Sequence, residues 1–193
     1  MKPAFEDAFG RADDQTIGNG WNEKTPSAFS LVGGAVKQTE VGNYRNMIVG
    51  RLEQVVDTTL SIEASFENFD ADPTLMARLQ SASTTVGSLV GYSFYAYVDH
   101  AYIDREEGTD PPTELASIAI EPKLDIGAKY RLTFKVTGTN PVKLEGSVTK
   151  LDGTPIISFS ANDASAKRIT AGGGYAFGSG DGKDSTFDNF KRY

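Results

Sequence analysis

Apolar and polar residues alternate along much of this sequence, which is the pattern of β-strands that bury one face. In Thr59–Phe69 (TLSIEASFENF) the apolar side chains share one face, and Ser and Glu occupy the other. Tyr130–Val136 (YRLTFKV) alternates in the same way, with its Arg, Thr and Lys facing outward. The pattern predicts further strands at Phe5–Phe9, Phe29–Gln38, Asn46–Leu52, Leu75–Ser81, Leu89–Ile103, Glu114–Ile120, Val142–Thr149, Pro155–Ala161, Gly173–Gly178 and Ser185–Arg192.

Turn-forming residues separate these strands at short intervals. Asp152-Gly153 lies between two predicted strands and is a strong hairpin signal, because glycine adopts positive φ without strain. We find no amphipathic helix of useful length, and only residues 161–168 are compatible with a short helical turn. No change of composition marks a domain boundary. We therefore expect residues 1–193 to form a single all-β domain, an antiparallel sandwich or barrel.

Composition and charge exclude some of the functions that an all-β domain can have. With 193 residues, of which 39% are hydrophobic, the chain is long enough to bury a core. Its net charge of -7 and its pI near 4.8 disfavour contact with phosphate backbones, so we expect no nucleic-acid partner. No apolar run approaches the roughly 20 residues that span a bilayer, so we expect no membrane insertion.

Cysteine is absent, which excludes disulfides, thiolate metal sites and a cysteine nucleophile. The first residues, MKPAFEDAFG, lack the apolar segment of a signal peptide, and the sequence has no Asn-x-Ser/Thr glycosylation sequon. We therefore expect synthesis in the cytoplasm. That expectation includes a virion component that is later exposed on the particle surface.

Candidate catalytic groups do not form a convincing set. Asp99 and the single histidine, His100, are neighbours, so in a strand they should point to opposite faces and form no dyad. No Gly-x-Ser-x-Gly turn is present for a Ser-His-Asp triad. Glu67 and Asp70 lie three apart and so on opposite strand faces, whereas glycoside hydrolysis needs two carboxylates about one sugar bond. We expect the protein not to be an enzyme.

The segment Gly91–Tyr102 (GYSFYAYVDHAY) is unusually rich in aromatic residues. Alternation places Tyr95, Tyr97 and Asp99 on one face, opposite a set that suits a core. Tyrosine rings stack on the apolar side of a sugar, and polar groups bind its hydroxyls. This row is therefore our main candidate for a glycan site. The alternative is that both faces of the strand are buried.

Three other residues are weaker candidates for ligand contact. Trp21 follows Asn19-Gly20 and suits either a core anchor or a contact at a loop tip. Tyr44 and Arg45 follow Gly42-Asn43 and could present a polar-aromatic pair at the start of a strand. The alternative for this pair is a simple turn flank.

The two chain ends carry similar short motifs, Phe5-x-Asp7-x-Phe9 and Phe187-Asp188-Asn189-Phe190. Together with Ile17-Gly18-Asn19-Gly20-Trp21, the strands from Tyr130-Arg131-Leu132 onward and Gly172–Gly178, they give a layout that resembles the concanavalin A-like lectin/glucanase jelly rolls. The likeness is greatest to laminin-G-like domains carried by bacteriophage and bacterial surface proteins. It covers nearly the whole chain, but the Glu-x-Asp-x-x-Glu strand of the family 16 glucanases is missing.

The resemblance implies a two-sheet antiparallel β-sandwich of the jelly-roll type, with a site on a concave face or a loop edge and with paired first and last strands. It also implies one structural Ca2+ where the terminal strands meet, with carboxylates from Asp188 and either Asp7 or Glu6. The alternative is that Asp188 pins a turn and Asp7 is solvated.

These observations favour a non-catalytic carbohydrate-binding module for a cell-surface polysaccharide, part of a phage or phage-like particle. As partners we expect a glycan and either further copies of the chain or a larger virion assembly. Two alternatives stay open: a structural assembly protein of the virion that binds no sugar, and a polysaccharide-cleaving enzyme.

Overall fold

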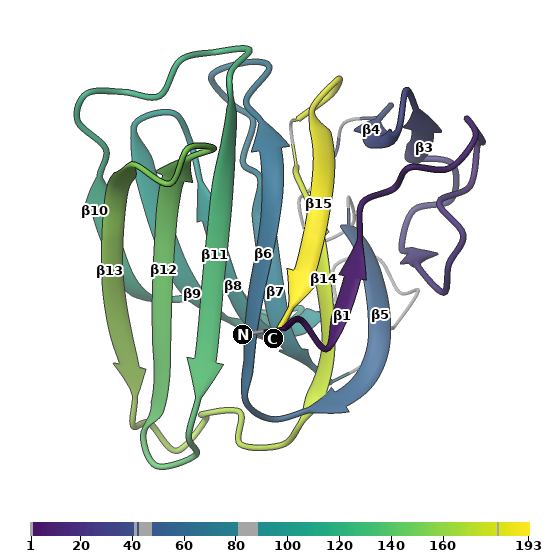
Figure 1. The fold of residues 1–193 in the computed structure, drawn as a ribbon. Coiled ribbons are helices and arrows are strands. Elements are labelled where there is room, and N and C mark those ends of the chain that lie inside the picture. The colour runs from purple at the N-terminus through teal and green to yellow at the C-terminus, as the bar shows by residue number, and fades with distance from the viewer. Residues whose placement is uncertain (1, 41, 43–47, 81–88, 181) are drawn as a thin grey trace.

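Residues 2–40, 42, 48–80, 89–180 and 182–193 are described by the structure, a computed structural model. They form two antiparallel sheets packed face to face, and they contain no helix (Figure 1). The front sheet of Figure 1 runs in the order β13 (Pro155–Asp163), β12 (Val142–Lys150), β11 (Lys129–Thr137), β6 (Thr58–Ser65), β15 (Thr186–Arg192), β4 (Ala35–Gln38) and β3 (Phe29–Val32), with β1 (Phe5–Asp7) also paired to β15.

The rear sheet lies behind it and holds the aromatic-rich segment. Its order is β10 (Thr113–Ala119), β9 (His100–Gly108), β8 (Leu89–Ala96), β7 (Thr74–Leu79), β14 (Gly173–Gly178), β5 (Ile48–Val55) and β2 (Asn22–Glu23). The predicted all-β class and two-sheet jelly-roll sandwich are confirmed. None of the described residues belongs to a helix long and apolar enough to cross a membrane.

Two predicted strands are in fact hairpins. Leu89–Ile103 divides into β8 and β9, because the chain turns back at residues 97–99 and the Tyr97 amide donates to the His100 carbonyl (2.8 Å). Phe29–Gln38 divides into β3 and β4 at Gly33-Gly34, both of which have positive φ. The helical turn expected at residues 161–168 is wrong, because β13 continues to Asp163 and a turn follows.

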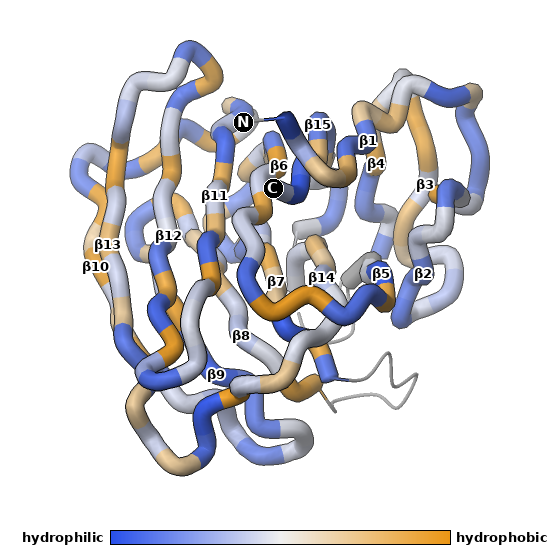
Figure 2. The backbone as a smooth tube through the Cα atoms, turned by 60° about the horizontal axis from the view of Figure 1, so that its bottom comes forward, coloured by the Kyte–Doolittle hydropathy of each residue, from blue (hydrophilic) through white to orange (hydrophobic). Residues whose placement is uncertain are grey.

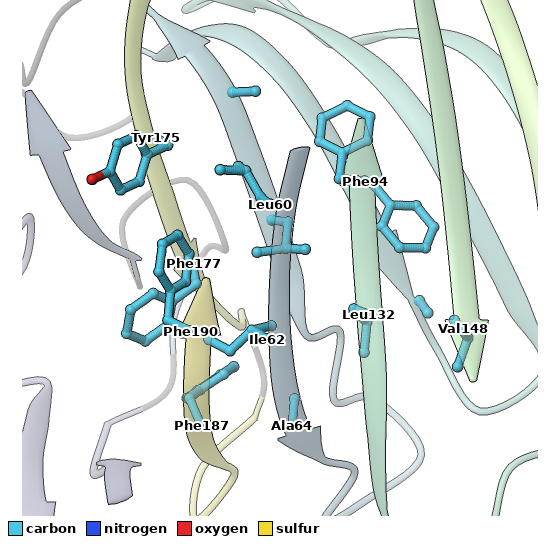
Figure 3. Packing of buried hydrophobic residues seen from close by; sticks show 14 of the residues in the cluster. Leu60, Ile62, Ala64, Phe94, Leu132, Val148, Tyr175, Phe177, Phe187 and Phe190 are labelled. Carbon is cyan, nitrogen blue, oxygen red and sulfur yellow. The ribbon is translucent and has the colours of Figure 1, made fainter. Parts of the chain in front are cut away.

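The core forms between the sheets from the apolar side of each alternating strand. In the front sheet, cross-strand pairs such as Leu132 and Ile62 present fully buried side chains to the interior. Phe94 of the rear sheet meets Phe134 with a ring separation of 6.0 Å. Figure 3 shows buried side chains of both sheets, among them Phe94 and Leu132. Burying each such side chain stabilises the fold by about 1.5–3 kcal/mol. Figure 2 shows the same alternation along β11, β12 and β13.

The two ends of the chain close the front sheet together, as the end motifs predicted. β1 pairs antiparallel with β15, placing Asp7 opposite Phe190, and β15 is also hydrogen-bonded to β6 and β4. The N and C termini therefore lie side by side (Figure 1). Because β15 lies within the sheet, its removal would break pairing on both sides.

Candidate functional site

Three tyrosines gather on the outer face of the rear sheet, and we call them the tyrosine platform: Tyr95, Tyr97 and Tyr102. Tyr95 of β8 and Tyr102 of β9 are cross-strand partners, and their rings stack with centroids 5.1 Å apart and planes 17° apart. Tyr97 meets both rings edge-on, at 6.0 Å and 6.2 Å. All three side chains are half-buried. The predicted alternation holds, because Phe94, Ala96 and Val98 on the other face are buried in the core.

Buried carboxylates lie beside the platform on β9. The Tyr95 hydroxyl donates to Asp104 Oδ2 (2.9 Å), and Asp104 is only 3% exposed. The Ser93 hydroxyl donates to Glu106 Oε1 (2.7 Å) within the same outer face, and both residues are fully buried. The hydrogen bond to Asp104 and the stacking on Tyr102 hold the Tyr95 ring in one orientation, so the platform is preorganised.

Polar groups with exposed ends surround the platform where β8 turns into β9. Asp99 accepts hydrogen bonds from Lys123 Nζ (2.9 Å), and His100 Nδ1 lies 3.1 Å from its other oxygen. The hydrogen bonds from Lys123 and then His100 lower the pKa of Asp99 below its usual value. Lys123 also lies over the ring of Phe69 at 5.3 Å, and Phe69 is 56% exposed.

Backbone pairing brings Lys123 to this place. The Ile120 amide donates to the Asp99 carbonyl and the Leu124 amide to the Val98 carbonyl, both at 2.7 Å. The 120–124 loop is thereby fixed against the β8–β9 turn. The expectation that Asp99 and His100 do not meet is wrong, because they lie in and next to a turn, where neighbouring side chains are not held on opposite faces.

Trp21 is a core anchor and not a contact at a loop tip. It is 7% exposed, and its ring lies edge-on to those of Phe190 (4.9 Å) and Phe177 (5.0 Å). Its Nε1 donates to Asp7 Oδ2 (2.9 Å). Its assignment as a ligand-binding residue is therefore wrong. The other weaker candidates, Tyr44 and Arg45, lie outside the described residues.

Asp7 does not fit the calcium site that the resemblance implies. Its Oδ1 accepts from the Phe9 amide (2.8 Å) and Arg11 Nη1 (2.7 Å), and its Oδ2 from Asn19 Nδ2 (2.8 Å) and Trp21 Nε1 (2.9 Å). Burial raises the pKa of Asp7, but these donors outweigh burial and lower it overall. Arg11 Nη2 also donates to Oδ2 (3.1 Å). A carboxylate whose lone pairs already face five N–H donors is poorly placed to bind a cation. Asp7 is 5% exposed, so the alternative that it is solvated is wrong. Its role as a calcium ligand stays a prediction of the resemblance, which these contacts disfavour.

Asp188 and Glu6 lie near the junction of the terminal strands, but their carboxylates do not form a cluster with that of Asp7. Asp188 accepts from the Asn189 amide (2.7 Å), and burial raises the pKa of its carboxyl group. Glu6 is exposed and alternates with Asp7, so it points to the other face of β1. Within the described residues, no group of three or more His, Asp or Glu side chains could hold a metal ion. The Ca2+ ion therefore remains a prediction from the resemblance alone.

Sequence reasoning found only part of this site. Tyr102 was missed because the β8–β9 turn was placed inside one long strand, and only the hairpin register sets Tyr102 beside Tyr95. Placing the turn at 97–99 would have revealed it. Lys123 and Phe69 carry no local signal, since long-range backbone pairing brings their loops together.

No protein-family model matches the chain, and no curated protein matches it. Solved structures do. A carbohydrate-binding module, CBM66 of Bacillus subtilis, has a TM-score of 0.62 and 14% identity, covering 90% of this chain and 94% of its own. The CBM2 module of the evolved Dit protein of Lactobacillus casei BL23 phage J-1 has a TM-score of 0.61 at 8% identity, covering 98% and 94%. Peanut lectin has a TM-score of 0.60 at 16% identity, covering 97% and 95%.

The chain has the two-sheet jelly-roll fold of these proteins. At such low identities the likeness shows the fold alone, and function must be argued from the site. The similarity to these structures supports, at the level of architecture, the resemblance to the concanavalin A-like lectins that the sequence showed.

Proposed function

We propose that this protein is a non-catalytic carbohydrate-binding module and that the tyrosine platform binds the apolar side of a sugar ring. The main observation in support is that Tyr95, Tyr97 and Tyr102 form a preorganised set on an outer sheet face. Aromatic rings held in place lose little conformational entropy on binding. Asp99, His100 and Lys123 at the rim offer acceptors and donors to the sugar hydroxyls.

The names of the similar structures support this proposal. Two of these proteins are carbohydrate-binding modules by name, and one of the two belongs to a phage Dit protein. A third is a lectin. A role in a phage or phage-like particle that attaches to a cell-surface polysaccharide is the corresponding finer proposal. Each hydrogen bond or stacking contact is worth only about 1 kcal/mol, so a single module binds weakly. Several copies in one particle or oligomer would gain avidity of about 10²–10⁴-fold.

Two carboxylates on β9 bring back the alternative that the protein is a polysaccharide-cleaving enzyme. Asp104 and Glu106 are two residues apart on a strand, so their Cα atoms lie roughly 6.5–7 Å apart, near the range of inverting glycosidases. Both side chains are buried and are bonded to Tyr95 and Ser93. They lie side by side on one strand and do not face each other across a cleft. This arrangement supports a positioning role and disfavours proton transfer to a sugar bond.

Binding should be tested by titrating the purified protein with neutral bacterial surface polysaccharides and their oligosaccharides. Tyr97→Ala and Tyr102→Ala should each weaken binding by roughly 5–30-fold, the equivalent of about 1–2 kcal/mol. Tyr95→Phe should bind more tightly than Tyr95→Ala, because it keeps the ring. Tyr193→Ala, which removes a half-buried tyrosine at the chain end, is the matched control.

Circular dichroism and the melting temperature must show that each variant remains folded. Normal binding by folded Tyr97→Ala and Tyr102→Ala would refute the site. Release of reducing ends from the polysaccharide by the wild-type protein would refute the non-catalytic proposal.

A further inference from the structure

The outer face of the front sheet carries a groove, distant in the fold from the tyrosine platform. Residues of β12 and β13, the strands at the left of Figure 1, line it. Its volume is about 320 Å³. That volume is at the lower end of the range for small-ligand sites, about 300–1,000 Å³. Its outward side chains are polar and exposed: Lys143, Glu145, Ser158, Ser160 and Asn162.

Strand register explains why these groups share one face. Lys143 is the cross-strand partner of Asn162, and Glu145 is the partner of Ser160. The alternate residues of both strands, such as Leu144 and Ala161, are buried toward the core. The groove therefore presents two hydroxyls, an amide, an ammonium and a carboxylate with spacings fixed by the sheet.

One of the two charges in the groove is already neutralised. Glu145 accepts a hydrogen bond from Lys135 Nζ (2.9 Å) on the neighbouring strand β11, where the two residues are cross-strand partners. Lys143 makes no ion pair within the described part of the chain. The groove thus carries an uncompensated positive charge on a protein whose net charge is -7.

We infer that this groove is a second saccharide site, selective for a sugar residue that bears a carboxylate. Lys143 would pair with the carboxylate, and Ser158, Ser160 and Asn162 would bind the ring hydroxyls. None of the outward groove side chains is aromatic, so binding there depends on charge and hydrogen bonds and not on stacking. Binding at the tyrosine platform on the opposite sheet depends instead mainly on stacking. One chain would thereby contact a neutral sugar and an acidic sugar of a polymer through different faces.

The test uses two probes of equal length, tetragalacturonate and the neutral galactotetraose, titrated into the full chain. Tetragalacturonate should bind more tightly, and its affinity should fall roughly 2–5-fold between about 50 and about 500 mM NaCl, because salt screens the Lys143 pair. Lys143→Ser should weaken tetragalacturonate binding by a similar factor, and Lys143→Glu should abolish it.

Lys150→Ser is the matched control, since Lys150 is an exposed lysine on the same strand that does not line the groove. It should bind tetragalacturonate as the wild type does, and so should Tyr97→Ala. Amide chemical-shift changes on titration should centre on Ser158, Ser160 and Asn162.

Three results would overturn the inference: no tetragalacturonate binding by the wild type, equal binding by Lys143→Ser and Lys150→Ser, or loss of binding in Tyr97→Ala with Lys143→Ser unaffected. The last result would place the acidic sugar on the tyrosine platform. The proposed neutral-sugar site is tested by the tyrosine variants with neutral polysaccharides, so either proposal can fail while the other stands.

Discussion

Replacing Asp7 by Asn should destabilise the protein strongly although it changes few atoms. Asp7 is 5% exposed, and each of its oxygens accepts at least two hydrogen bonds. The amide of Asn can accept through one atom only, so at least two donors lose their partner. If the Oδ2 position becomes the NH2 group, Trp21 Nε1, Asn19 Nδ2 and Arg11 Nη2 lose their acceptor. If instead the Oδ1 position becomes the NH2 group, the Phe9 amide and Arg11 Nη1 lose their acceptor.

The expected cost follows from the number of lost partners. A buried donor left without an acceptor costs about 1–3 kcal/mol. Loss of the ion pair with Arg11, whose side chain is 33% exposed, adds less than the roughly 3–5 kcal/mol of a fully buried pair. We expect Asp7→Asn to lower the free energy of unfolding by about 3–5 kcal/mol, a large fraction of the 5–15 kcal/mol typical of a domain. Urea unfolding followed by tryptophan fluorescence measures it, because Trp21 is the single tryptophan and contacts Asp7.

The same contacts predict a pH dependence. The pKa of Asp7 is lower in the folded protein than in the unfolded chain, where it is about 3.9. Its stabilising contribution is therefore complete above that unfolded value and is lost as pH falls through the folded pKa. Wild-type stability should decline below about pH 4, and Asp7→Asn should show a shallower decline. Glu63 and Asp163 also have lowered pKa values, so some decline remains in the variant.

Glu6→Gln is the control for both measurements. Glu6 is the exposed neighbour of Asp7 on β1, and its substitution should change stability by no more than about 0.5 kcal/mol. A loss below about 1 kcal/mol in Asp7→Asn, or an equal loss in Glu6→Gln, would refute the central role of the Asp7 hydrogen bonds.

Two further predictions test the core and the chain ends. Gly146→Ala should destabilise the fold by about 1–3 kcal/mol, because the new Cβ would lie 2.6 Å from the Phe94 ring; Gly10→Ala, where nothing lies within 4 Å, should be nearly neutral. Deletion of residues 185–193 should unfold the domain, because β15 is paired on both sides; a folded deletion variant with an unchanged melting temperature would contradict this role.

The sequence by itself determined the all-β class, most of the strands and the face on which Tyr95 and Tyr97 lie. These features follow from alternation with a period of two, which is a local property of an extended chain that buries one side. The end motifs also predicted the pairing of the terminal segments, because a strand at a chain end is protected when it joins a sheet.

The tertiary structure decided which side chains meet. Hairpin register added Tyr102 to the platform, and the 120–124 loop brought Lys123 to Asp99. The same long-range packing buried Trp21, a candidate for ligand contact, against Phe190. It also made Asp7, which the resemblance implied as a calcium ligand, the hydrogen-bond acceptor of Trp21. Lateral contacts between strands depend on register and on partners far along the chain, and hydrophobic periodicity carries no information about either.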